Sequence, residues 1–245
     1  MKKRIVLILI IQFIFIVSLT ALYAENDAFI KGLDYYQKGE FELARAHFEE
    51  AKSLEPTNPT IYFYLGNVYY QLKDIDNAIL NYTRGLDFTN EKGPFFYNLG
   101  NCYFVKNNYD MALEMYKKAI EYDQNLFDAY LNSGNAYYLE KKYDKTIESW
   151  ETYLEKNPNT PQYDKIKKAI AYLKQELEKM KTEENTSKTS ASSEASAKDE
   201  SKKKENDNLL NDIMGDLNQI IKQTENVMET SEEPINDLSS EDIER

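Results

Sequence analysis

The feature that most constrains the fold of this chain is a repeat with a period of 34 residues. A seven-residue phrase returns at positions 64, 98 and 132, as YLGNVYY, NLGNCYF and NSGNAYY. Four glycines keep the same interval: Gly32, Gly66, Gly100 and Gly134. Self-similarity at a fixed period of this size indicates one supersecondary unit that is copied along the chain, each copy stacking on the next.

Each copy predicts a pair of helices. In the second copy, residues on one helical face follow the spacing i, i+3, i+4 and i+7: Tyr62, Leu65, Gly66 and Tyr69. Residues 73–76, KDID, predict a turn, and an apolar face of Ala78, Tyr82 and Leu86 predicts the second helix.

A glycine inside every first helix requires an explanation, since glycine costs about 1 kcal/mol there relative to alanine. We expect that it lets the partner helix approach closely and seat its aromatic side chain. Two dipeptides, Asn58–Pro59 and Thr160–Pro161, predict an N-cap followed by a proline in the first helical turn.

Further positions agree between the copies. A tyrosine follows each glycine by three residues, and a large aromatic follows it by sixteen: Phe48, Tyr82, Tyr116 and Trp150. With these residues in register, the sequence resembles the tetratricopeptide repeat family, with copies over 25–58, 59–92, 93–126 and 127–160. The resemblance implies an all-α fold, a right-handed α-solenoid of about four helix-turn-helix repeats. The last copy departs from the pattern with the larger residues Thr146 and Tyr153.

The sequence after the repeats divides into four parts. Residues 161–180 carry apolar side chains on one side only and predict a capping helix. Residues 181–208 lack large apolar side chains and predict a disordered linker. Residues 209–228 predict a short amphipathic helix, and 229–245 an acidic disordered tail. The stripe of the amphipathic segment consists of Leu210, Ile213, Leu217 and Ile220.

Residues 1–24 have the layout of an export signal. Three basic residues at positions 2–4 precede an apolar run, and small residues stand before a polar sequence. Cleavage after Ala24 is one interpretation, and an uncleaved membrane anchor is the other, because the apolar run just reaches the length of a membrane span. Both interpretations place the rest of the chain in the periplasm or cell envelope, in the second case attached to the inner membrane.

Charge and chemistry exclude several classes of function. The formal net charge of −12 disfavours nucleic acid as a partner, because such binding needs basic residues against phosphates. The only cysteine is Cys102 and the only histidine is His47, so a disulfide within the chain and most catalytic triads are excluded. No phosphate loop or metal-ligand spacing is present. We therefore predict a protein that is not an enzyme and binds neither a cofactor nor a metal.

A second stripe on the first helices is the candidate binding surface. The resemblance implies that it lines the concave face of the solenoid, where asparagines hold the main chain of an extended peptide and neighbouring side chains contact its side chains. The candidate residues are Phe63, Asn67, Tyr70, Tyr97, Asn98, Asn101, Phe104, Asn132, Asn135 and Tyr138. The subtype that clamps a terminal carboxylate is disfavoured, because the relevant places lack lysine and arginine: Thr60, Phe63, Pro94, Tyr97, Asp128 and Leu131.

Two functional hypotheses follow. The first is an interaction scaffold of the bacterial envelope that binds a protein or peptide segment in the concave groove. The second is a self-associating or autoinhibited component in which residues 209–228 occupy a groove of the same chain or of a neighbour. Contact with a membrane is expected only through an uncleaved N-terminal segment.

Overall fold

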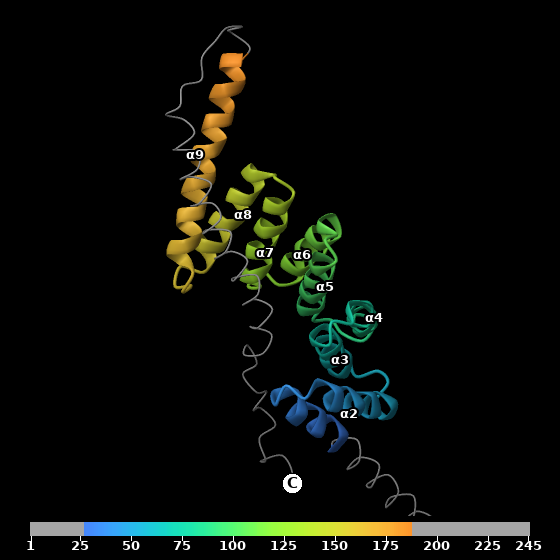
Figure 1. The fold of residues 1–245 in the computed structure, drawn as a ribbon. Helices are drawn as coiled ribbons and strands as arrows, with labels where there is room; N and C mark the ends of the chain where they lie inside the picture. The colour runs from blue at the N-terminus through green and yellow to red at the C-terminus, as the bar shows by residue number, and fades with distance from the viewer. Residues whose placement is uncertain (1–26, 188–245) are drawn as a thin grey trace, which may run out of the picture. The chain divides into compact units, whose positions relative to one another are not determined.

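The structure is a computed structural model that describes residues 27–187, and every regular element within this range is a helix. The predicted all-α class is thereby confirmed. None of the helices in this range is long and apolar enough to span a bilayer. The predicted export signal, amphipathic segment and acidic tail lie outside the described residues. The chain divides into two compact units after Asn108, and each is described by itself (Figure 1).

In the part of the first unit that the structure describes, five helices follow one another. The first spans 27–37 within the described residues, and the others are α2 (Phe41–Leu54), α3 (Pro59–Gln71), α4 (Ile75–Gly85) and α5 (Gly93–Val105). Each of the helices α2, α3 and α4 packs against the helix that follows it. The predicted N-cap of α3 is confirmed, because the side-chain oxygen of Asn58 accepts a hydrogen bond from the backbone N–H of Thr60 at 3.0 Å.

The repeated glycines have the packing role expected from the sequence. A Cβ at Gly66 would lie 2.4 Å from the ring of Tyr82 on α4, and one at Gly32 would lie 2.6 Å from Phe48 on α2. Both aromatic side chains are fully buried. The absence of a glycine side chain therefore creates the space in which the second helix of each repeat seats its aromatic ring.

The turn inside each repeat has a left-handed residue at a constant position. The four residues are Gly39, Lys73, Asn107 and Lys141, with φ between 57° and 72°. The turn also closes in the same way each time; for example, the N–H of Asp74 donates to the carbonyl of Tyr69 at 2.8 Å. Only the first copy has a glycine here. In the other three turns, a residue with a side chain adopts the left-handed conformation, which costs about 1–2 kcal/mol of backbone strain.

Up to Ser187, where the described residues end, the second unit contains four helices. They are α6 (Tyr109–Tyr122), α7 (Phe127–Leu139), α8 (Tyr143–Lys156) and α9 (Tyr163–Ser187). A Cβ at Gly134 of α7 would lie 2.3 Å from Trp150 of α8, so the glycine-and-aromatic pair recurs. The core of this unit joins α7, α8 and the near end of α9, where Ile166 is fully buried in one cluster with Trp150 and Tyr153.

The cap differs from its predicted bounds at both ends. Thr160 is not the N-cap of α9, because the helix begins at Tyr163 and its first backbone bond runs from Ile166 N–H to the Gln162 carbonyl. The Thr160 hydroxyl pairs with the Tyr153 hydroxyl at 2.9 Å and accepts a longer hydrogen bond, of 3.4 Å, from the backbone N–H of Gln162, just before the helix begins. At the other end, the helix continues past 180 to Ser187, into the predicted linker. No glycine or proline interrupts this sequence, and a solvated helix needs no apolar residue to continue.

Candidate functional site

The first-unit part of the predicted stripe begins on α3, where two of its three residues are buried. Asn67 and Tyr70 are each only 3% exposed, and Phe63 is partly buried. The hydroxyl of Tyr82 on α4 donates a hydrogen bond of 2.6 Å to Oδ1 of Asn67. The ring of Phe63 lies edge-on to Phe95 of α5, with centroids 5.3 Å apart. The Asn67 amide therefore joins the two helices of its repeat.

The stripe continues on α5 with a different pattern of burial. Asn98 and Asn101 are buried, whereas the rings of Tyr97 and Phe104 are partly exposed. The side-chain oxygen of Asn98 is buried and has no hydrogen-bond partner among the described residues. An asparagine oxygen normally accepts a hydrogen bond when it is buried, so this amide holds an unused acceptor.

The second-unit part of the stripe lies on α7. Asn132 and Asn135 are buried, and Nε1 of Trp150 donates to Oδ1 of Asn135 at 3.0 Å. The Asn135 amide group also donates to Oδ1 of Asn132 at 3.4 Å. Tyr138 stacks on Trp150 with centroids 6.2 Å apart, and burial, followed by the neighbouring phenols of Tyr143 and Tyr172, raises the pKa of Tyr138.

Asn67 and Asn135 thus occupy the same repeat position and make the same kind of contact. Each accepts a hydrogen bond from the large aromatic that its repeat seats against glycine, which satisfies a polar group that would otherwise be buried alone. The sequence left this structural role open beside a role in binding, because an asparagine next to glycine is equally compatible with an exposed amide. The proposed role of both residues in peptide binding stays a prediction.

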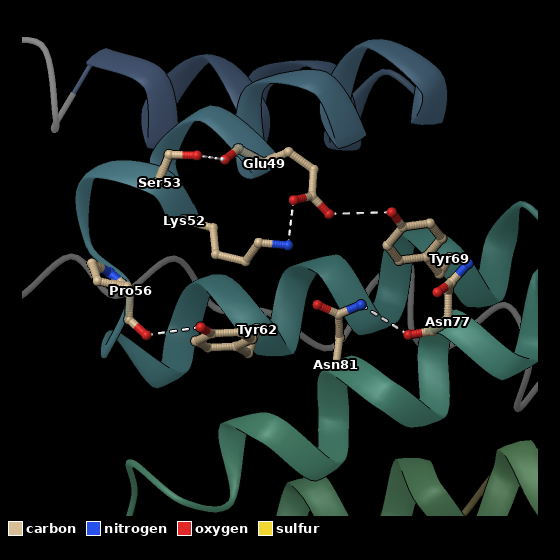
Figure 2. Close-up of polar contacts among 8 residues, drawn as sticks. All are labelled: Glu49, Lys52, Ser53, Pro56, Tyr62, Tyr69, Asn77 and Asn81. Atoms are coloured by element: carbon tan, nitrogen blue, oxygen red, sulfur yellow. Dashed lines mark hydrogen bonds and ion pairs between the residues drawn. The ribbon is translucent and has the colours of Figure 1, made fainter.

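A polar network that the sequence did not predict crosses from α2 to α3 (Figure 2). The hydroxyl of Tyr69 donates to the carboxylate of Glu49 at 3.2 Å, and Lys52 pairs with the same carboxylate. Near the end of α2, the hydroxyl of Tyr62 donates to the carbonyl of Pro56 at 2.8 Å. Polar contacts therefore cross this surface of the first unit from one helix to the next.

The potential metal ligands and the single thiol of the described residues do not form a reactive site. The described residues contain no group of three or more metal-ligating side chains that is able to hold an ion. Cys102 is fully buried on α5, and burial raises the pKa of its thiol. A thiol in such surroundings is a weak nucleophile, because the thiolate is the reactive form.

Comparison with known families identifies the repeats one by one. Models described as tetratricopeptide or TPR repeats match residues 32–73, 59–91, 94–126 and 128–160. Three of these ranges follow the predicted copies closely, and the fourth begins in the first copy and extends into the second. No curated protein sequence matches the chain.

Solved structures share the fold at low sequence identity. The MamA protein is 20% identical, with a TM-score of 0.55 over 70% of this chain and 98% of that one. A tetratricopeptide repeat protein from Parabacteroides merdae is 17% identical, with a TM-score of 0.56 over 64% of this chain and 62% of that one. Cut9, solved with Hcn1, is 21% identical, with a TM-score of 0.53 over 58% and 29% of the two chains. From the four matched repeats and the shared fold, the chain belongs to the tetratricopeptide repeat family.

Proposed function

We propose that this protein is a non-enzymatic interaction scaffold of the bacterial cell envelope that binds an extended segment of another protein along its first-helix faces. Proteins of this family generally mediate protein–protein interactions. The observation that carries the proposal is the face of α5, where the partly exposed rings of Tyr97 and Phe104 flank buried asparagines. Aromatic rings offer a large contact area at low entropy cost, and such residues are enriched where proteins bind each other.

The unused oxygen of Asn98 supports an extended peptide as the ligand. A main-chain N–H is a suitable donor for this oxygen, and an ordered ligand donor would remove the cost of leaving it unpaired, about 1–3 kcal/mol. A small shift of the Asn98 side chain is needed to reach a ligand, because the residue is 4% exposed. Within this proposal, Asn67 and Asn135 support the face by holding the second helices, and the aromatic rings supply most of the contact.

The envelope location rests on residues 1–24. A fusion of these residues to alkaline phosphatase, which folds actively only outside the cytoplasm, tests export. We expect phosphatase activity that is lost when the apolar run is interrupted by charged residues. An inactive fusion would refute the envelope location and leave the binding proposal untouched.

Peptide binding is tested with the purified protein and a displayed library of random peptides. We expect selected peptides to bind wild-type protein and to lose at least about tenfold in affinity, about 1.4 kcal/mol, when Tyr97 and Phe104 are both replaced by alanine. The matched control is Tyr122→Ala on α6, because that tyrosine is 55% exposed and outside the stripe. Equal binding by the double variant, with the helical content of all proteins unchanged, would refute this face as the site.

A further inference from the structure

The second unit contains an open groove. It has a volume of about 630 Å³ and is formed by α6, α7 and α8, a size within the range of ligand-binding pockets. Its lining includes Leu113, Ile120, Tyr130, Ser133, Tyr137 and Ser149. All of them belong to the second unit, and none is part of the predicted peptide-binding stripe.

The groove has a local cause in the sequence. Ser133 stands where the two preceding copies have Leu65 and Leu99, which are 0% and 4% exposed. Leucine at this position fills the space between a first helix and its neighbours, whereas the Ser133 hydroxyl turns back and donates to the Ala129 carbonyl of its own helix at 2.7 Å. The smaller side chain leaves this volume of the repeat unfilled.

The contact that crosses the same surface in the first unit is also replaced. There, Glu49 of α2 accepts from Tyr69 of α3 (Figure 2). Two repeats later, Lys117 takes the place of Glu49 and Tyr137 that of Tyr69. Lys117 pairs with Glu121 on its own helix at 3.8 Å, and its side chain is 77% exposed.

The lining of the groove specifies the kind of ligand. Leu113, Ile120, Tyr130 and Tyr137 provide apolar surface, and further lining residues, Lys117, Lys145 and Glu148 among them, supply charges of both signs. The ammonium of Lys145 lies 5.3 Å from the centre of the Tyr137 ring, at the side of the groove. A groove that combines apolar side chains with charges of both signs suits an amphipathic helix, whose apolar stripe covers the apolar side chains.

We propose that residues 209–228 of the same chain dock in this α6–α8 groove. Their aliphatic residues recur at helical spacing, Leu210, Ile213, Leu217 and Ile220, so one side is apolar and the other polar. The described part of the chain ends in this same unit, at Ser187 of α9, and α8 packs against both α7 and α9.

The connection is long enough for docking within one chain. The 25-residue helix α9 measures about 37 Å at 1.5 Å per residue. A linker of the length of residues 188–208 has a maximum reach of roughly 70 Å, at about 3.3 Å per residue, which exceeds the length of α9. A tether of this kind raises the local concentration of the segment to about the millimolar range, so even a weak contact is populated.

The docking is tested by disulfide cross-linking in the full-length chain, whose native cysteine is buried and leaves engineered ones to react alone. Ser149→Cys in the groove is combined with Ile213→Cys on the apolar stripe. The matched control combines Ser149→Cys with Asn211→Cys, which has the same tether but lies on the opposite side of the predicted helix. Mild oxidation, denaturing electrophoresis and peptide mass spectrometry identify cross-links within one chain.

We expect the Ile213 pair to cross-link within the chain about tenfold faster than the Asn211 pair, since both share one tether and differ only in orientation. Ser133→Leu, which restores the side chain of the two preceding copies, should abolish this difference, whereas Ser53→Leu on exposed α2 surface should preserve it. Leu217→Asp together with Ile220→Asp should also abolish it without altering a described residue. Equal rates for the two pairs, cross-links only between chains, or an unchanged rate in Ser133→Leu would each overturn the proposal.

Discussion

Substitution of Gly66 by alanine tests most directly why the 34-residue period exists. The new Cβ would lie 2.4, 2.5 and 2.7 Å from three ring atoms of Tyr82. The ring would have to retreat by about 1 Å to reach an ordinary carbon–carbon contact of about 3.5 Å. It is fully buried, and its hydroxyl is held by Asn67 at 2.6 Å, so a retreat disturbs both the packing and this hydrogen bond.

The expected magnitude follows from three contributions to the free energy of unfolding. Overpacking of a core costs about 1–3 kcal/mol, and a weakened buried hydrogen bond about 1 kcal/mol more. Alanine recovers about 1 kcal/mol, because it is the better helix former. We therefore expect Gly66→Ala to lower the stability by about 1–3 kcal/mol, in contrast to the gain that helix propensity alone would give.

The assay is urea unfolding followed by circular dichroism, with Tyr82→Leu and the double variant Gly66→Ala/Tyr82→Leu measured alongside. A smaller residue at 82 leaves room for the new methyl group, so the double variant should lose less than the sum of the two single losses, by about 1–2 kcal/mol. A stabilised Gly66→Ala protein, or losses that simply add, would refute steric contact as the reason for the glycine.

Four further measurements test other contacts. Tyr82→Phe should cost about 1–3 kcal/mol in urea unfolding, because it leaves the buried Asn67 oxygen unpaired; a loss below about 0.3 kcal/mol would contradict this. Cys102 should react with a thiol reagent only after urea unfolding, since burial raises its pKa, and rapid labelling of the folded protein would be evidence against this. Lys141→Gly should raise the free energy of unfolding by up to about 1 kcal/mol, because Lys141 has a φ of 59°, in the left-handed region that glycine adopts without strain. A lower urea midpoint for this variant would argue against backbone strain at Lys141. Burial raises the pKa of Asp128, so the folded state keeps this proton to a higher pH than the unfolded state. The free energy of unfolding of Asp128→Asn should therefore increase relative to that of wild type as the pH rises from about 3 to about 7. A difference in unfolding free energy that does not change with pH would contradict this.

The sequence by itself determined the repeat unit, its helix pairs and the reason for its glycines. These properties depend on spacing along the chain, and a period of 34 residues with apolar residues at helical intervals leaves few alternatives. The loss of helix stability that a glycine causes at position 66 indicated that another helix packs closely there. In the structure, the ring of Tyr82 lies at this place. The N-cap at Asn58 was also predictable, since its partner lies two residues away.

Only the tertiary structure decided which polar side chains make hydrogen bonds within the protein and which stay accessible to a ligand. Asn67 and Asn135 looked like ligand contacts because their spacing matches a face, but their oxygens accept from aromatic residues of the next helix. Ser133 looked like one small residue among others, yet between three helices it leaves a groove where Leu65 is buried two copies earlier. Such outcomes depend on which atoms meet across helices that are separate in sequence, and periodicity places a residue on a face without showing what lies opposite.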